Sequence, residues 1–61
     1  MSSGYEWQRC TVEQWEKKVE LSLQNGQMAS AIKYADLANC RQMYDEGMEA
    51  KIIQNRFGDF E

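Results

Sequence analysis

The sequence predicts an all-α fold, an antiparallel helical hairpin preceded by an extended N-terminal arm. Three observations predict it: apolar residues recur at helical spacing, the 61 residues contain no proline, and an Asn25-Gly26 pair separates two helical segments. Because the connection is short, the two helices must be antiparallel neighbours. We therefore divide the chain into an arm over residues 1–10, a hairpin domain over residues 11–57 and a frayed tail over residues 58–61.

The first helix is predicted over residues 12–24. It opens with the pattern of a capping box, in which Thr11 caps the helix and the Gln14 side chain reaches back to the N–H of Thr11. At about 100° per residue, one stripe of this helix carries Val12, Trp15, Val19 and Leu23. This stripe is expected to face the second helix, with Leu21 on the opposite side.

The second helix is predicted as a longer helix over about residues 28–55, and its continuation through Gly47 stays open. Its alanine-rich sequence favours helix. Mainly small residues share one stripe and let the first helix approach closely: Met28, Ala31, Ile32, Ala35 and Ala38. Gly47 is the expected point of any break or kink, because glycine costs about 1 kcal/mol relative to alanine inside a helix.

Part of this hairpin carries residues seen in known helical families. The first set consists of Trp15, Gly26 at the turn, Ala31-Ile32-Lys33-Tyr34 and Ala38. With this set, residues 15–38 resemble a single tetratricopeptide-type helix–turn–helix unit, although Lys18-Val19 replaces the usual Leu-Gly and no proline follows. A second, overlapping set is similar to a hairpin segment of the phage-shock-protein A family: Trp15-Glu16, Glu20-Leu21, Leu23-Gln24-Asn25-Gly26 and Ala31. Both resemblances imply a helical hairpin, and the tetratricopeptide resemblance also implies protein binding.

Composition argues against several classes of function. Ten acidic and seven basic residues give a net charge of −3, so we expect no direct binding of nucleic acid. The absence of histidine removes the commonest general base and metal ligand, and Ser22 and Ser30 have no base to activate them. We therefore expect no enzyme, no catalytic residue, no metal and no cofactor. No apolar run reaches the roughly 18 residues of a membrane span, and the first residues do not form a signal peptide, which favours a cytoplasmic protein.

A second apolar stripe on the second helix is the predicted partner-binding surface. Tyrosine, methionine and arginine are enriched where proteins meet. The predicted partner-binding residues are Trp7, Tyr34, Leu37, Arg41, Tyr44 and Met48. The alternative is that the arm folds back and covers part of this stripe through Tyr5 and Trp7. The partner is either another protein or a second copy of the chain.

Two further features have a structural and a functional interpretation. Cys10 and Cys40 lie fifteen residues either side of Asn25, so a hairpin brings them to one level and permits a disulfide. Cys40, however, points away from the stripe that faces the first helix, which favours two unpaired cysteines. The acidic C-terminal third is either a solvated surface or a contact with a basic partner; it contains Asp45, Glu46, Glu49, Asp59 and Glu61.

Three hypotheses of function follow from these features. The first is a small regulator or inhibitor, of the kind that bacteria and phages encode, that docks an apolar helix face on a larger protein. The second is a small structural subunit of a larger assembly or a homo-oligomer. The third is an acidic mimic of nucleic acid, which predicts salt-sensitive binding to a DNA- or RNA-binding protein.

Overall fold

The computed structural model describes residues 5–57; the first four residues of the predicted arm and the predicted tail over residues 58–61 lie outside it. The described part of the chain is helical and contains no strand. Its elements, in chain order, are the 3₁₀ turn η1 (Glu6–Gln8) and the helices α1 (Val12–Gln24), α2 (Met28–Asp45) and α3 (Ala50–Phe57). The predicted all-α class is therefore confirmed for these residues.

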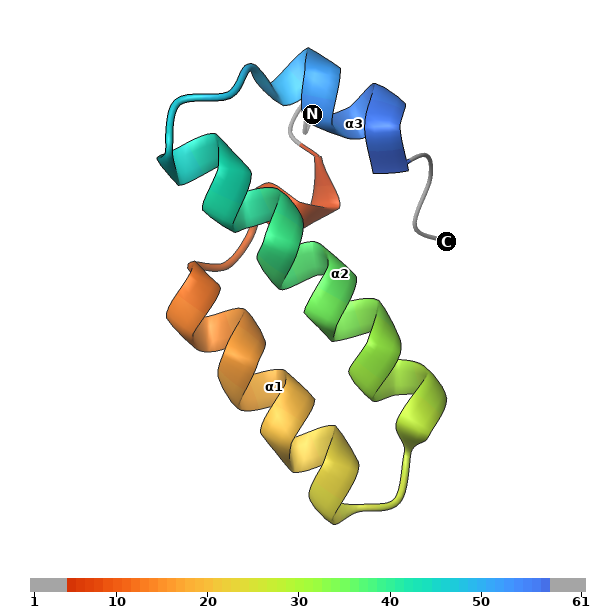
Figure 1. The fold of residues 1–61 in the computed structure, drawn as a ribbon. Coiled ribbons are helices and arrows are strands. Elements are labelled where there is room, and N and C mark those ends of the chain that lie inside the picture. Colours follow the sequence, from red (N-terminus) through yellow and green to blue (C-terminus); the bar gives the residue numbers. More distant parts are fainter. Residues whose placement is uncertain (1–4, 58–61) are drawn as a thin grey trace.

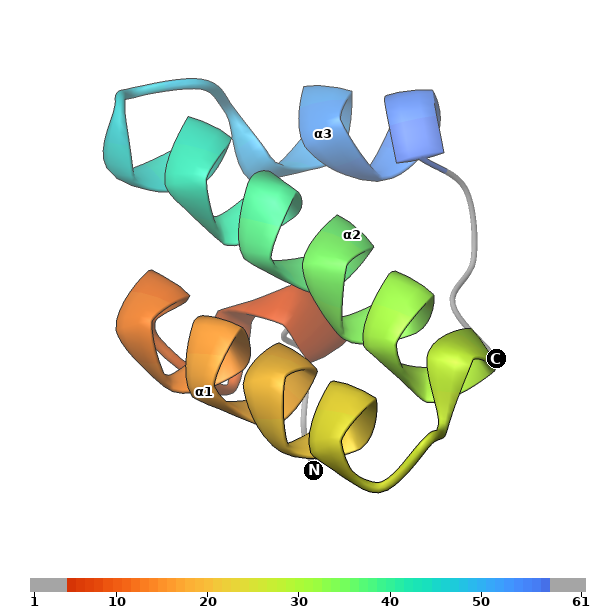
Figure 2. The same ribbon diagram turned by 60° about the horizontal axis from the view of Figure 1, so that its bottom comes forward.

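Helices α1 and α2 form the predicted hairpin. They lie side by side and antiparallel, and the connection between them is short (Figures 1 and 2). The start of α1 is set by a reciprocal capping box, because the Gln14 N–H donates to Thr11 Oγ1 at 3.2 Å and the Thr11 N–H donates to Gln14 Oε1 at 2.9 Å. The prediction of a helix over residues 12–24 agrees with the bounds of α1.

Helix α1 ends in a Schellman motif centred on Gly26. Gly26 has a φ of +74°, in the left-handed region that favours glycine. The Gln27 N–H donates to the Ser22 carbonyl at 2.8 Å and the Gly26 N–H donates to the Leu23 carbonyl at 3.1 Å, which satisfies two carbonyls at the helix end. The chain then reverses and begins α2 at Met28.

The prediction that the second helix extends over residues 28–55 is wrong. A second Schellman motif ends α2 at Asp45: Gly47 has a φ of +112°, the Met48 N–H donates to the Met43 carbonyl and the Gly47 N–H donates to the Tyr44 carbonyl, both at 3.0 Å. Helix α3 starts after this break and folds back over α2 on the side away from α1 (Figure 2). The return places Ile53, which is fully buried, in the core.

The arm packs into the same core. We expected residues 1–10 to be extended, whereas residues 6–8 form the 3₁₀ turn η1, which lies against α2 (Figure 1). The reason is Trp7, whose side chain is fully buried. The core cluster thus draws on all four elements: Trp7, Trp15, Leu37, Ala38, Cys40 and Ile53.

Candidate functional site

The predicted partner-binding stripe on α2 is largely covered in the structure. Trp7 and Leu37 have no exposed surface, and Tyr34, Arg41 and Met48 are half-buried. Only Tyr44 of the six predicted residues is exposed, at 41%. Trp7 and Leu37 therefore present no side-chain surface to solvent in this structure, and their role in binding a partner stays a prediction.

The arm covers the stripe through aromatic and polar contacts. The Trp7 ring lies 5.4 Å from the Tyr44 ring and stacks on the Tyr5 ring at 5.6 Å, measured between centroids. Trp7 Nε1 donates to Gln54 Oε1 of α3 at 3.1 Å. Arg41 Nη1 donates to the Gln8 carbonyl at 3.1 Å, so this arginine serves the packing of the arm. The alternative interpretation, in which the arm folds back over α2, describes this arrangement.

A second aromatic contact joins the arm, α1 and α2. The Trp15 ring stacks on the Tyr34 ring with centroids 5.8 Å apart, and Trp15 Nε1 donates to the Trp7 carbonyl at 3.0 Å. The Lys18 ammonium lies 5.9 Å from the centroid of the Tyr34 ring, within cation–π range. Contacts within the hairpin therefore half-bury Tyr34, which packs against the core cluster.

The two cysteines are free thiols with different surroundings. Cys10 is half-buried beside α1, whereas Cys40 is fully buried in the core cluster. Burial, and secondarily the charge of Asp36, raise the pKa of the Cys40 thiol to about 11. A thiol with so high a pKa stays protonated at neutral pH, so Cys40 is suited to packing and not to nucleophilic or redox chemistry.

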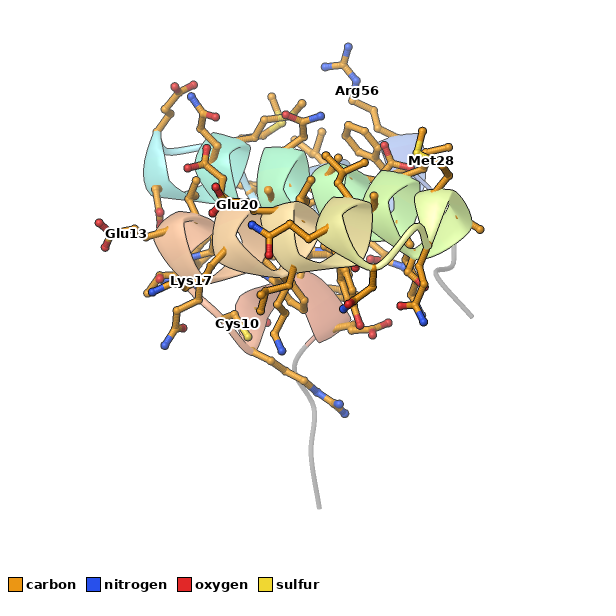
Figure 3. All side chains as sticks on the ribbon, turned by 90° about the horizontal axis from the view of Figure 1, so that it is seen from below. Cys10, Glu13, Lys17, Glu20, Met28 and Arg56 are labelled. Atoms are coloured by element: carbon orange, nitrogen blue, oxygen red, sulfur yellow. The ribbon has the colours of Figure 1, made fainter. Side chains whose placement is uncertain are left out.

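Three exposed apolar side chains lie around the turn of the hairpin. Leu23 in the last turn of α1 is 50% exposed, and Met28 and Ile32 in the first turns of α2 are each 60% exposed. We call Leu23, Met28 and Ile32 the hairpin-tip patch. Figure 3 shows Met28 on the side of the molecule opposite Cys10 and the arm. Met28 of the patch therefore faces away from the surface that the arm covers.

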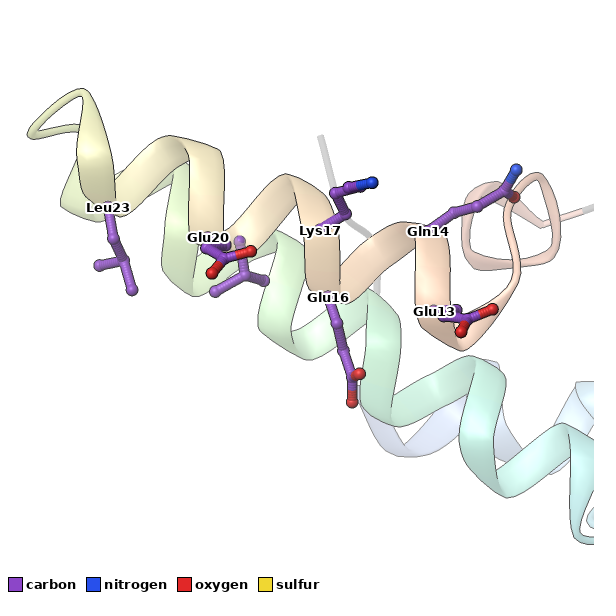
Figure 4. Close-up of a pocket in the computed structure, with 7 residues that line it drawn as sticks. Glu13, Gln14, Glu16, Lys17, Glu20 and Leu23 are labelled. Atoms are coloured by element: carbon purple, nitrogen blue, oxygen red, sulfur yellow. The ribbon is translucent and has the colours of Figure 1, made fainter.

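Carboxylates border this patch on α1. A shallow hollow on the outer surface of α1 contains three acidic residues and one basic residue; it is lined by Glu13, Gln14, Glu16, Lys17, Val19, Glu20 and Leu23 (Figure 4). Glu16 and Leu23 extend to the same side of the helix, whereas Lys17 extends to the other (Figure 4). The apolar surface of Leu23 thus adjoins negative charge.

The spacing of Leu23, Met28 and Ile32 predicts that they lie in the interface between the two helices, whereas all three are exposed. The angular positions of Met28 and Ile32 around α2 argue against a place in that interface. Met28 and Ile32 lie roughly 60–120° around α2 from Ala31 and Ala38, at about 100° per residue, and it is Ala31 and Ala38 that are buried. A stripe that wide extends beyond the strip of α2 that a single neighbouring helix can cover.

None of the family models, curated proteins or solved structures with which the sequence was compared matches it. The resemblances to a tetratricopeptide-type unit and to the phage-shock-protein A family therefore have no support beyond the residues given for them. Within residues 5–57, no helix has the length and apolar character to cross a membrane. The same residues contain no group of three or more acidic or cysteine side chains placed to hold a metal ion.

Proposed function

We propose that the protein is a small non-enzymatic regulator or inhibitor that binds a larger protein through the hairpin-tip patch. The observation that carries the proposal is the exposure of Leu23, Met28 and Ile32, each at least half exposed, at one end of a packed hairpin. An apolar patch held on the surface of a small protein is typical of an interaction site.

The scaffold beneath the patch supports this proposal. The capping box, the Schellman motif and the stacking of Trp15 on Tyr34 fix the two helices that carry the patch. A patch on fixed helices loses little conformational freedom on binding, which favours affinity. Methionine and long aliphatic side chains also adapt to the shape of a partner.

A second candidate, a structural subunit of a larger assembly, is favoured by exposed apolar residues outside the patch. Leu21 is 53% exposed and Ile52 is 48% exposed. Leu21 lies about 100–120° around α1 from the buried Trp15 and Ser22, at 100° per residue, and Ile52 belongs to α3. An obligate subunit would bury several such surfaces at once, whereas a regulator needs one.

Site-specific photo-crosslinking tests the proposal. A photoreactive phenylalanine analogue replaces Ile32 in one variant and Asn55, an exposed polar residue of α3, in the control variant. We expect a discrete crosslinked protein from the source cells with the first variant and not with the second. The purified partner should then bind the wild-type chain and lose at least tenfold in affinity for Leu23→Asp/Ile32→Asp. Equal crosslinking at both positions would contradict docking through the patch.

A further inference from the structure

We propose that the hairpin-tip patch binds a basic amphipathic helix of its partner, with the lysine or arginine edge of that helix lying along α1. This inference rests on the proposed function and adds the chemistry of the partner. It follows from how charge is distributed around the patch.

The carboxylates next to Leu23 have no ion-pair partner within the described part of the chain. Glu16 and Glu20 are exposed, line the same hollow as Leu23 and form no ion pair among residues 5–57. Glu20 lies three residues before Leu23, and Glu16 lies seven before it, so both are close to Leu23 on the helix surface. A positively charged side chain of a partner could therefore form an ion pair with the Glu16 or Glu20 carboxylate.

Three of the four cations of α1 and α2 contact groups within the molecule, and the fourth, Lys17, lines the hollow but extends to the other side of α1 from Glu16 and Leu23 (Figure 4). Lys33 Nζ lies 3.8 Å from Glu6 Oε2 of η1, Lys18 lies over the Tyr34 ring, and Arg41 pairs with Asp45 at 3.0 Å while it binds the arm. Arg56 extends from α3 on the same side of the molecule as Met28 (Figure 3). The patch side is therefore acidic along α1 and carries positive charge at α3, with α2 between them.

This polarity favours a basic helix over a second copy of the chain. A second copy brings another net charge of −3 to a surface whose α1 border is already acidic. A helix with an apolar stripe at i, i+3 and i+4 can lay that stripe on Leu23, Met28 and Ile32. Its basic edge then meets Glu16 and Glu20, which fixes its orientation and speeds its association.

Two matched peptides test the inference. Each forms about five turns of amphipathic helix with one leucine stripe, and the residues beside the stripe are all lysine in one peptide and all glutamate in the other. The ¹⁵N,¹³C-labelled full chain is titrated with each peptide, and the shifts of the Leu23, Met28 and Ile32 methyl resonances report binding at the patch. Control titrations use the Glu16→Gln/Glu20→Gln variant and the Glu49→Gln variant.

We expect the lysine peptide to bind at least tenfold more tightly than the glutamate peptide, and more weakly as salt rises from about 50 to 300 mM. Glu16→Gln/Glu20→Gln should weaken the lysine peptide at least threefold, and Glu49→Gln should leave it unchanged. Equal binding of both peptides at the patch would overturn the inference and leave the proposed function standing. Patch shifts that grow with the concentration of the chain alone would also overturn it, in favour of a second copy. If neither peptide perturbs the patch, both the inference and the proposed docking site fail.

Discussion

Replacing Trp7 with alanine should unfold much of the protein. The Trp7 side chain is fully buried and contacts Tyr5, Tyr44 and Gln54. A buried tryptophan removes about 150–250 Å² from water, worth about 4–6 kcal/mol at 25 cal/mol per Å². Measured tryptophan-to-alanine changes in cores cost about 3–5 kcal/mol. The substitution keeps the Trp7 carbonyl that accepts from Trp15, so the loss comes from the side chain.

That loss is large relative to the stability of so small a chain. At roughly 0.05–0.15 kcal/mol per residue, 61 residues have a free energy of unfolding of about 3–9 kcal/mol. We therefore expect Trp7→Ala to be largely unfolded in buffer or to unfold at a much lower urea concentration. Urea titrations followed by far-ultraviolet circular dichroism measure the change.

Two control variants separate the contribution of the core from that of the surface. Trp7→Phe keeps a buried ring but loses the donor to Gln54, and we expect it to cost about 1–3 kcal/mol, less than alanine. Leu23→Ala lies in the exposed patch and should change stability by about 0.5 kcal/mol or less. A Trp7→Ala variant that loses less than about 1 kcal/mol would refute the packing of the arm into the core, because it would place Trp7 among surface residues.

Other predictions concern the caps and the thiols. Thr11→Ala should cost about 1 kcal/mol in urea titrations and Thr11→Ser much less, because serine keeps the oxygen that accepts from the third helical N–H. Gly47→Ala should lower the free energy of unfolding by about 1–3 kcal/mol, because alanine rarely adopts a φ of +112°. An added Cβ meets no atom within 4 Å, so the cost comes from the backbone and not from a clash. An increase in stability would argue for a continuous helix. With a thiol reagent at pH 8, Cys10 should react at once and Cys40 only as the chain unfolds; equal rates would contradict the burial of Cys40. The folded state holds the Cys40 proton up to about pH 11, whereas the unfolded state releases it above pH 9. The free energy of unfolding should therefore decrease between pH 9 and pH 11. Cys40→Ala should remove the part of this decrease that comes from the thiol.

The sequence predicts the hairpin well because its signals are local. The capping box fixes the start of α1 through atoms three residues apart. The periodic stripe then places Trp15 and Ala31, both buried, on the facing sides of the two helices. Such signals act within a few residues and do not depend on the rest of the fold.

The break after α2 and the burial of the arm depend on contacts distant in sequence. Glycine at position 47 marks a weak point, but the end of α2 is favoured because the return of α3 buries Ile53. Likewise, Trp7 is buried because α2 and α3 together offer Tyr44 and Gln54 around its ring. The stripe on α2 was therefore predicted as an apolar surface, but its covering by the arm follows only from the tertiary structure.

In the structure the arm covers the apolar stripe on α2, whereas the three side chains of the hairpin-tip patch stay exposed. A two-dimensional NOE spectrum of the free chain tests this directly. We predict cross-peaks from the Trp7 indole protons to the Tyr44 ring and to the Gln54 side chain, and none from these protons to Met28. Trp7 cross-peaks confined to its sequence neighbours would contradict the account, because the stripe through Leu37 and Tyr44 would then be open to a partner.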